Sequence, residues 1–361
     1  MLSLMLLVPS LILVVMMWLP PQSWTLWLAR FVALETSLVA SGLGLAALLC
    51  GRGHFTIQGL AFGSLMAGLV PLLSALPVYA RERQRFSLLA WCTGGATPSV
   101  AIDRDIELAP GLRADLYRAP GNGPHPFVMV VHGGSWRSGD KGVADRESRA
   151  FAAAGTTVID VQYRLAPQHP FPAAVEDVRL LLRAVRARAD SLQIDPDRAA
   201  LLGRSAGAQI ALLAAHSAGE VVAAHPDNIV VRAVISLYGP TDLAWSHSHP
   251  FLPDVVDGTA ALEQYLGGSP EQNPDAYRRA TPMTWAAHAT AATLILHGTA
   301  ERCVRVANAE RLRDALSSAG KSVKLVLVPF AEHGFDVRPG GIGAQLSRGL
   351  ILDFLRTSLA R

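Results

Sequence analysis

Charged side chains are absent from two long stretches near the start of this 361-residue chain. Neither Met1–Ala29 nor Phe55–Ala80 contains one, and residues 31–50 between them contain only Glu35. Each of the three runs reaches the roughly 18 to 20 apolar residues that a helix needs to cross a hydrocarbon layer about 30 Å thick. We therefore predict a membrane region over residues 1–85 with three transmembrane helices.

The alternatives for these runs are a secretory signal peptide and a buried core helix. A signal peptide opens with basic residues and ends at a small-residue cleavage site, whereas this chain has no basic start and continues into two more apolar runs. Trp18, Trp24 and Trp27 cluster where the first run meets the second, as aromatic side chains do at a membrane interface. Glu35, one turn from Arg30, is expected to reach that interface.

A basic cluster, RERQR at Arg81–Arg85, directly follows the third run and has the position of a stop-transfer flank. With three spans, the positive-inside rule places this cluster and Arg30 on the cytoplasmic side and only Arg52 outside. The predicted location is a multi-pass membrane protein whose second domain faces the cytoplasm. Residues 86–100 are predicted to be a linker, and residues 101–361 a catalytic domain.

The formal net charge of +3 is too modest to suggest a nucleic-acid partner, and no basic block with interleaved aromatic residues occurs. Cys50 falls in an apolar run, so Cys92 and Cys303 alone cannot form a disulfide framework, and no CxxC spacing suggests zinc. His247 and His249 have no third ligand nearby and are expected on the surface. We predict no metal and no cofactor, and the oligomeric state stays open.

The periodicity of the chain changes after residue 100. Two short segments separated by a Pro-Gly turn, 102–110 and 112–120, have the pattern of a hairpin. Apolar runs such as FVMVV then alternate with helices, the clearest of which has apolar side chains at helical spacing from Phe171 to Val185. This alternation predicts an α/β fold with a mostly parallel sheet and helices on both faces. Function in such a sheet gathers at the carboxyl ends of the strands.

The sequence GRSAG at Gly203–Gly207 fits the G-x-S-x-G pattern, in which a serine occupies a sharp turn between a strand and a helix. The apolar run AALL precedes it and an apolar helix pattern follows, which is the context that the pattern requires. A packing turn of small residues is the alternative. Ser205 is the candidate nucleophile.

An acyl-transfer site also needs backbone N–H donors aimed at the oxygen that becomes negative. The stretch VVHGGSW ends an earlier strand, and the consecutive glycines Gly133 and Gly134 leave such donors uncovered. The N–H of Ala206, next to the nucleophile, would be the third donor. His132 is expected to brace this loop rather than to react.

A nucleophilic serine needs a base and an orienting acid, which in this fold follow it in the order serine, acid, histidine. His333, in FAEHGF, and Glu301, in HGTAERCV, both follow predicted strands. His297 competes as the base, but it precedes the acid and is expected to brace its loop. Asp336 competes as the acid and is expected to point elsewhere.

The motifs HGGSW, YRLAPQHPFPAAVEDV, GRSAG, YGPTDL, HGTAERCV and EHGF occur here in one order and context. In this the chain resembles α/β-hydrolases of the hormone-sensitive-lipase and bacterial carboxylesterase group, and it is also similar to the acetyl-xylan and feruloyl esterase branch. The resemblance runs from about residue 100 to the C-terminus and implies an α/β-hydrolase fold. It implies Ser205 as nucleophile, His333 as base, and Gly133, Gly134 and Ala206 as the oxyanion hole.

The chain departs from that family at three places. The acid is usually aspartate, and Glu301 stands there; Ser135 occupies the place of a third glycine. The amphipathic lid that often precedes the core is replaced by the apolar region, so we expect a more open pocket. Asp242–Thr284 remains the candidate for a cap.

Together these observations predict a membrane-anchored serine carboxylesterase that acts on a small-molecule ester without a cofactor. Its partners would be that substrate and the lipid bilayer. An amidase of the formamidase type and an esterase for acetylated glycans are alternatives within the enzyme class. A membrane scaffold or receptor with an inactive hydrolase domain is the alternative from another class.

Overall fold

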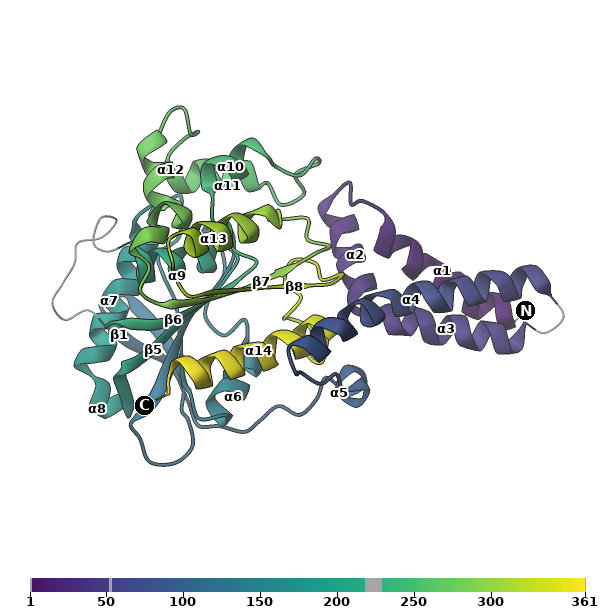
Figure 1. The fold of residues 1–361 in the computed structure, drawn as a ribbon, viewed down its shortest axis with the longest axis horizontal. Coiled ribbons are helices and arrows are strands. Elements are labelled where there is room, and N and C mark those ends of the chain that lie inside the picture. The colour runs from purple at the N-terminus through teal and green to yellow at the C-terminus, as the bar shows by residue number, and fades with distance from the viewer. Residues whose placement is uncertain (1, 52–53, 218–228, 361) are drawn as a thin grey trace.

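The computed structural model describes residues 2–51, 54–217 and 229–360. Arg52, on which the predicted outside charge depends, lies outside these residues. The described chain forms a catalytic domain around one sheet, from which an arm of apolar helices projects (Figure 1).

The sheet has eight strands in the order β1-β2-β4-β3-β5-β6-β7-β8. The predicted hairpin of β1 and β2 is present, and β2 pairs antiparallel with β4, whereas all the remaining pairs are parallel. The mostly parallel sheet expected from the alternating pattern is thus confirmed. The strands are β1 (Ile102–Ala109), β2 (Leu112–Tyr117), β3 (His125–Val131), β4 (Thr157–Val161), β5 (Ile194–Arg204), β6 (Val231–Leu237), β7 (Ala292–Gly298) and β8 (Val323–Val328).

Helices cover both faces of this sheet. Successive side chains of a strand point to opposite faces, and the central strands have apolar side chains on each face. One core lies between the sheet and the helices α7 (Ala173–Ala187), α9 (Ala206–His216) and α13 (Ala307–Ser318). A second core lies between the other face and α6 (Asp145–Ala153) and α14 (Ile342–Ser358). The short helix α8 (Ala189–Leu192) precedes β5.

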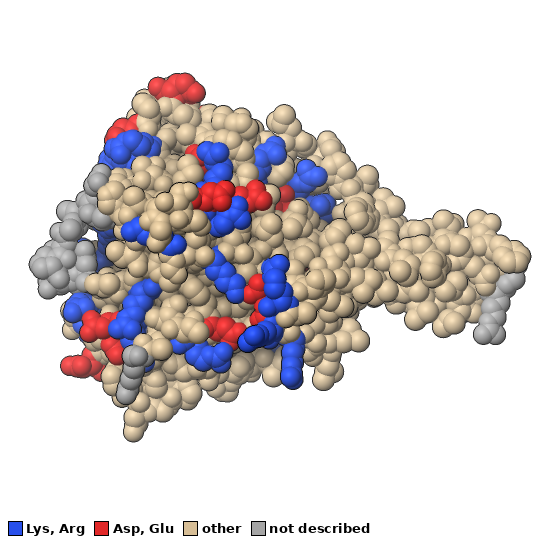
Figure 2. Space-filling view, in the orientation of Figure 1, with Lys and Arg blue, Asp and Glu red and all other residues tan. Residues whose placement is uncertain are grey.

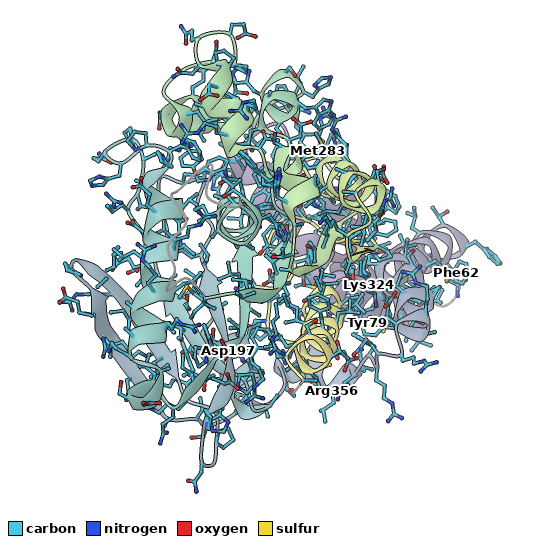
Figure 3. All side chains as sticks on the ribbon, turned by 60° about the vertical axis from the view of Figure 1, so that its left-hand side comes forward. Phe62, Tyr79, Asp197, Met283, Lys324 and Arg356 are labelled. Atoms are coloured by element: carbon cyan, nitrogen blue, oxygen red, sulfur yellow. The ribbon has the colours of Figure 1, made fainter. Side chains whose placement is uncertain are left out.

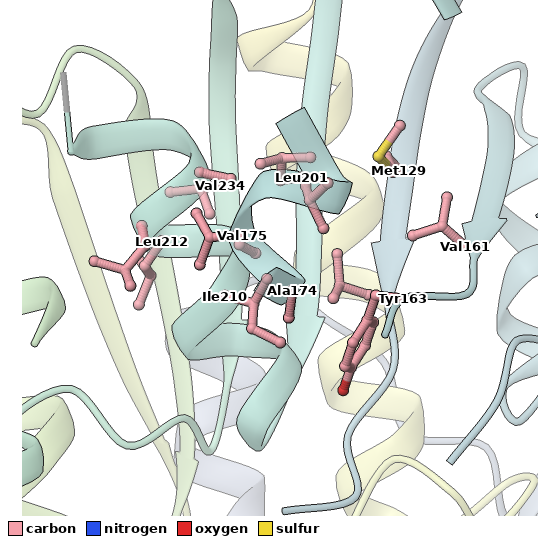
Figure 4. Close-up of a cluster of buried hydrophobic side chains, with 14 of the residues drawn as sticks. Met129, Val161, Tyr163, Ala174, Val175, Leu201, Ile210, Leu212 and Val234 are labelled. Atoms are coloured by element: carbon pink, nitrogen blue, oxygen red, sulfur yellow. The ribbon is translucent and has the colours of Figure 1, made fainter. Parts of the chain in front are cut away.

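Figure 4 shows the first of these cores. Met129 and Leu201 from the central strands are buried against Ala174 and Val175 of α7 and Ile210 of α9. The helix predicted from the apolar spacing of residues 171–185 packs there as its pattern required. Close packing of this kind holds the carboxyl ends of the strands, and the loops that follow them, in fixed positions.

The segment proposed as a cap, Asp242–Thr284, folds into short helices at one side of the domain (Figure 1). Side chains from this segment line the cavity that contains Ser205, in agreement with that expectation. The helices are α10 (Leu243–Ser248), α11 (Gly258–Leu266), α12 (Pro274–Ala280) and the 3-10 helix η1 (Pro282–His288).

The described residues of the apolar N-terminal region form four helices, not three. The first run breaks after Trp18, because Pro20 and Pro21 cannot continue a helix, and Ser23 then caps the next helix by accepting from the N–H of Leu26 at 3.3 Å. The helices are α1 (Leu2–Trp18), α2 (Trp24–Glu35), α3 (Ser37–Cys50) and α4 (Phe55–Arg81).

The prediction of three membrane spans is therefore not supported. Within the described residues, α4 is long and apolar enough to cross a membrane, and the pair α2 and α3 would add a second candidate if its 67° bend belongs to one broken span. Helix α1, with 17 residues, is shorter than such a span. Length and composition alone make this weak evidence for a transmembrane region.

The arm packs through small side chains. A Cβ atom at Gly44 of α3 would lie 2.7 Å from the backbone nitrogen of Leu65, and one at Gly68 of α4 would lie 2.7 Å from the carbonyl oxygen of Ser37. The hydroxyl of Ser41 donates to the carbonyl of Leu65 at 3.0 Å. Helices α3 and α4 therefore approach each other closely, and the larger apolar side chains point outward.

The end of α4 packs against the catalytic domain, across the boundary predicted at residue 85. Ala75, Val78 and Tyr79, at the end of α4, belong to the same core as α14, and the Tyr79 hydroxyl donates to the carbonyl of Ile342 at 2.6 Å. Figure 3 shows Tyr79 beside the catalytic domain and Phe62 of the same helix out on the arm. The predicted linker contains the short helix α5 (Leu88–Thr93).

Candidate active site

Ser205 lies in a strained turn between β5 and α9. Its backbone adopts φ 53° and ψ −122°, which is unfavourable for a residue with a side chain and holds the serine at the tip of the turn. A Cβ atom at Gly203 would lie 2.2 Å from the carbonyl oxygen of Gly207, and one at Gly207 would lie 2.3 Å from that of His132. Both glycines of the motif are therefore required by close backbone contacts.

Three side chains from separate loops meet at this turn. His333, from the loop after β8, places its Nε2 3.0 Å from the Ser205 Oγ. Its Nδ1 lies 3.1 and 3.0 Å from the two carboxylate oxygens of Glu301, in the loop after β7. Glu301 therefore lies within hydrogen-bond distance of the ring nitrogen that faces away from Ser205.

The Glu301 carboxylate is buried and is held by its own loop. The backbone N–H groups of Cys303 and Val304 donate to its Oε1 at 2.7 and 3.0 Å. The ring of His297 is 2.9 Å from the Val304 carbonyl through Nε2, so it braces this loop as expected. The longer glutamate side chain is thus fixed on three sides.

The charges of His333 and Glu301 stabilise each other. Burial alone would lower the pKa of His333, but the negative charge of Glu301 and its hydrogen bond outweigh burial and raise that pKa above its ordinary value. Burial would likewise raise the pKa of Glu301, and the charge and hydrogen bond of His333 hold it below its ordinary value. The arrangement favours an imidazolium paired with a carboxylate.

The glycines of the HGGSW loop line the same cavity as Ser205 and Ala206. In the part of the chain that the structure describes, the N–H groups of Gly133 and Gly134 donate to no other protein group. They are available to a ligand oxygen, as the predicted oxyanion hole requires. Whether they and the Ala206 N–H hold an oxyanion stays a prediction.

Two aromatic contacts fix this loop. Trp136 is buried, donates from Nε1 to the Gln209 side chain at 2.9 Å and stacks on Tyr265 with centroids 4.7 Å apart. His132 stacks on Tyr163 at 4.2 Å, and the Tyr163 hydroxyl donates to the His132 carbonyl at 3.0 Å. His132 therefore braces the loop, as expected.

Asp336 points away from His333. Its two oxygens accept from the Arg204 guanidinium and from the Tyr238 hydroxyl, each at 2.6 Å, and all three side chains are buried. Asp336 is a structural partner of Arg204, and Glu301 is the carboxylate that faces the histidine.

The cavity around Ser205 has a volume of about 680 Å³ and is mostly apolar. The cap contributes Phe251 and Leu262, and His249, expected on the surface, also lines it. Trp24 and Trp27 of α2 line it as well. The sequence did not predict this, because nothing in the apolar run indicates which part of it touches the catalytic domain.

The sequence analysis did not predict that Glu332 and Arg30 lie beside the site. Glu332 is buried next to His333, where burial and the neighbouring charge of Glu301 raise its pKa to about 7. It forms a buried ion pair with Arg30 of α2. Glu35, expected at a membrane interface, is instead buried against Gly341 of the catalytic domain, so that expectation was wrong.

Glu301, Cys303 and His333 offer ligand atoms within 4.8 Å of one another, which is the only such group among the described residues. A metal there would have to displace the Glu301–His333 hydrogen bond. Burial, followed by the charge of Glu301, raises the pKa of the Cys303 thiol well above its ordinary value, so the thiolate that binds metals is disfavoured. The chemistry of these three residues therefore suits the hydrogen bond between Glu301 and His333 better than it suits a metal ion.

Comparison with known proteins identifies the family of the chain. The sequence model of the BD-FAE family matches residues 114–316, which is more than half of the chain. The chain belongs to the BD-FAE family. This family assignment and the relatives below confirm the resemblance to α/β-hydrolases of the hormone-sensitive-lipase and carboxylesterase type.

The relatives include two Mycobacterium tuberculosis proteins. Esterase LipQ is 26% identical over 296 residues, which cover 80% of this chain and 66% of LipQ. Carboxylesterase NlhH is 42% identical over 97 residues, which cover 27% of this chain and 30% of NlhH. The BD-FAE chain thus spans less than two thirds of either relative.

Among solved structures, a Pyrobaculum calidifontis esterase aligns with a TM-score of 0.63 at 25% identity, covering 74% of this chain and 88% of that one. A bacterial heroin esterase aligns with the same TM-score of 0.63 at 23% identity, over 76% of this chain and 89% of that one. The second comparison supports the fold alone.

We expect Asp336→Asn to destabilise the protein. The substitution leaves the buried Arg204 charge without its partner, which should lower the free energy of unfolding by about 3 to 5 kcal/mol. Asp353→Asn is the control, because Asp353 pairs with the exposed Arg356 and should change the value by about 1 kcal/mol or less. Denaturant titration followed by fluorescence would measure both; equal stabilities would contradict the structural role of Asp336.

Proposed function

We propose that this BD-FAE protein is a membrane-associated serine carboxylesterase. The observation that carries the proposal is the hydrogen-bonded series Ser205, His333, Glu301 at the wall of an apolar cavity. Its curated relatives named as esterases support the reaction class.

The positions of Ser205, His333 and Glu301 are compatible with each step of acyl transfer. The Oγ of Ser205 attacks the ester carbonyl carbon while His333 Nε2 takes the hydroxyl proton, and the carbonyl oxygen becomes negative beside Gly133, Gly134 and Ala206. The tetrahedral species collapses, the carbon–oxygen bond to the alcohol breaks, and His333 returns the proton to the leaving oxygen. Water then attacks the acyl-enzyme by the same route, which releases the acid and restores Ser205. Glu301 keeps the imidazole oriented and pairs with its positive form.

The alternative classes differ in how they fit the site. An inactive scaffold would have no reason to maintain the backbone strain at Ser205 or the buried Glu301 carboxylate facing His333. An amidase or an esterase for acetylated glycans would use the same three side chains. The predominantly apolar lining of the cavity favours an ester with an apolar group over a glycan.

The surface of the arm supports association with a membrane. Figure 2 shows charged side chains gathered on the catalytic domain, and none among the described residues on the visible face of the arm. Large apolar side chains are exposed there, and α3 and α4 pack through Gly and Ser, as helices in a bilayer do. Exposed apolar faces of this extent mark an interaction surface. The cytoplasmic location of the catalytic domain stays part of this proposal.

We expect Ser205→Ala to abolish esterase activity while the protein stays folded. Removal of a nucleophile from such a series lowers the rate by about 10⁴ to 10⁶. Hydrolysis of p-nitrophenyl acetate would measure the loss, and the parent protein should react with a fluorophosphonate probe that leaves the variant unlabelled. More than a few per cent of residual activity would refute the assignment of Ser205.

We expect Glu301→Gln to lower kcat by about 10³ to 10⁴, and Glu301→Asp to be partly impaired through distance. His333 accepts a proton only when neutral, so activity falls as the pH drops through its pKa, which Glu301 holds above the ordinary value. Without the negative charge of Glu301, burial lowers the pKa of His333, so the acid limb of the pH profile should move to lower pH. A pH profile of kcat/KM would measure the shift; an unmoved limb would contradict the role of Glu301.

A further inference from the structure

Helix α2 is the part of the arm that reaches the cavity. Trp24 and Trp27 stack on each other with centroids 4.6 Å apart, and both line the cavity that holds Ser205. Trp27 is buried, whereas 54% of Trp24 is exposed, so Trp24 belongs both to the cavity and to the surface of the arm. The cap contributes the apolar residues Phe251 and Leu262 to the same cavity.

The surface around Trp24 is itself apolar. Exposed large hydrophobic residues precede and follow it in sequence: Trp18, Leu19, Leu26 and Leu28. Apolar side chains thus extend from the arm to the cavity. An alkyl chain following them would avoid the free-energy cost of crossing water.

We propose that the substrate is a long-chain ester held in the bilayer, and that Trp24 guides its alkyl chain from the arm surface to Ser205. This proposal rests on the proposed esterase function. A bilayer ester uses the arm and the cavity together, whereas a short soluble ester needs neither the exposed tryptophan nor the apolar arm.

The test compares two substrates of the full chain: p-nitrophenyl decanoate carried in phosphatidylcholine vesicles, and p-nitrophenyl acetate in water. Trp24→Ala should lower the ratio of decanoate to acetate kcat/KM by about tenfold, which corresponds to losing the burial of roughly two methylene groups. Phe62→Ala is the matched control, because Phe62 is a 53% exposed aromatic residue on α4 of the same arm, away from the apolar surface around Trp24, and does not line the cavity. It should leave the ratio unchanged.

The outcomes separate this proposal from the esterase function. If the parent hydrolyses neither ester, the proposed function fails. If it hydrolyses acetate but Trp24→Ala leaves the ratio unchanged, or Phe62→Ala lowers it equally, the bilayer route is wrong. Flotation with the vesicles reports membrane binding separately, and a parent that hydrolyses acetate without floating also overturns the route.

A different observation concerns Arg30, which lies in α2 five residues before the helix ends at Glu35. Its Nη1 donates to the carbonyl of Ala300 at 2.9 Å and pairs with the Glu332 carboxylate. Ala300 precedes Glu301 and Glu332 precedes His333 in the chain. One guanidinium therefore contacts both loops that carry the partners of Ser205.

Glu332 extends this contact into the backbone of both loops. Its Oε1 accepts from the N–H of Arg302 at 2.6 Å and from the N–H of His333 at 3.0 Å. Apolar residues of α1 and α2, among them Met17 and Leu34, pack around the same place. A buried carboxylate beside Glu301 would be costly without its cation.

The geometry points to Arg30 as a positioning residue that holds the Glu301 and His333 loops in register through Glu332 and Ala300. The arm is then part of the catalytic apparatus and not only an anchor. A displacement of about 1 Å at such a site can lower a rate by about 100-fold.

The test uses p-nitrophenyl acetate, so that it does not depend on the bilayer route. Arg30→Met should lower kcat by about 10- to 100-fold and change KM by less than about threefold, because the reacting groups move while the cavity stays. Arg30→Lys should retain more kcat than Arg30→Met, since lysine can still pair with Glu332. Arg81→Met is the control, because Arg81 pairs with Glu82 at an exposed position and should leave kcat unchanged.

A double variant distinguishes positioning from folding. In Arg30→Met combined with Glu332→Gln, no buried charge is left unpaired, and the amide can still accept from the two N–H groups, so kcat should recover part of its loss. An unchanged kcat in Arg30→Met would overturn the proposal. Equal losses in all three variants, with no rescue by lysine or by the double change, would also overturn it.

Discussion

The hydrogen bond between Glu301 and His333 requires a charged carboxylate inside the protein, and several groups around the site stabilise that buried charge. A buried carboxylate without partners is costly by several kcal/mol. Here two N–H groups of its own loop and the His333 ring satisfy it, while His297 holds the carbonyl of Val304 and so fixes the loop. The strained turn at Ser205 then meets a histidine whose orientation is already determined.

The two neighbouring carboxylates, Glu301 and Glu332, also require a compensating positive charge. Glu332 lies beside Glu301, and its burial together with the negative charge of Glu301 raises its pKa. The cation that compensates comes from α2 and not from the catalytic domain. The packing of Tyr79 into the core of α14 ties the arm to the domain at another point. The arm and the catalytic domain therefore form one packed structure.

Local sequence patterns predicted the elements of the catalytic domain well. Apolar spacing predicted helix α7, and the Pro-Gly turn predicted the β1–β2 hairpin. The turn at Ser205 was predicted from its two flanking glycines, which approach neighbouring backbone closely. The errors lie where local pattern says little. The first apolar run is interrupted at Pro20 and Pro21, a signal that was available, whereas the burial of Glu35 against Gly341 depends on a residue far along the chain.

The sequence by itself determined that an apolar N-terminal region with few charges precedes an α/β domain with a serine turn, and it predicted two glycines for an oxyanion and an acid and a base in the required order. Periodicity and turn chemistry encode such features, because they depend on neighbours in the chain. Only the tertiary structure decided that α2 walls the cavity and that Arg30 meets Glu332, 302 residues away. A pair of that separation forms only when the whole chain has packed, since no local pattern fixes which buried charge will need which partner.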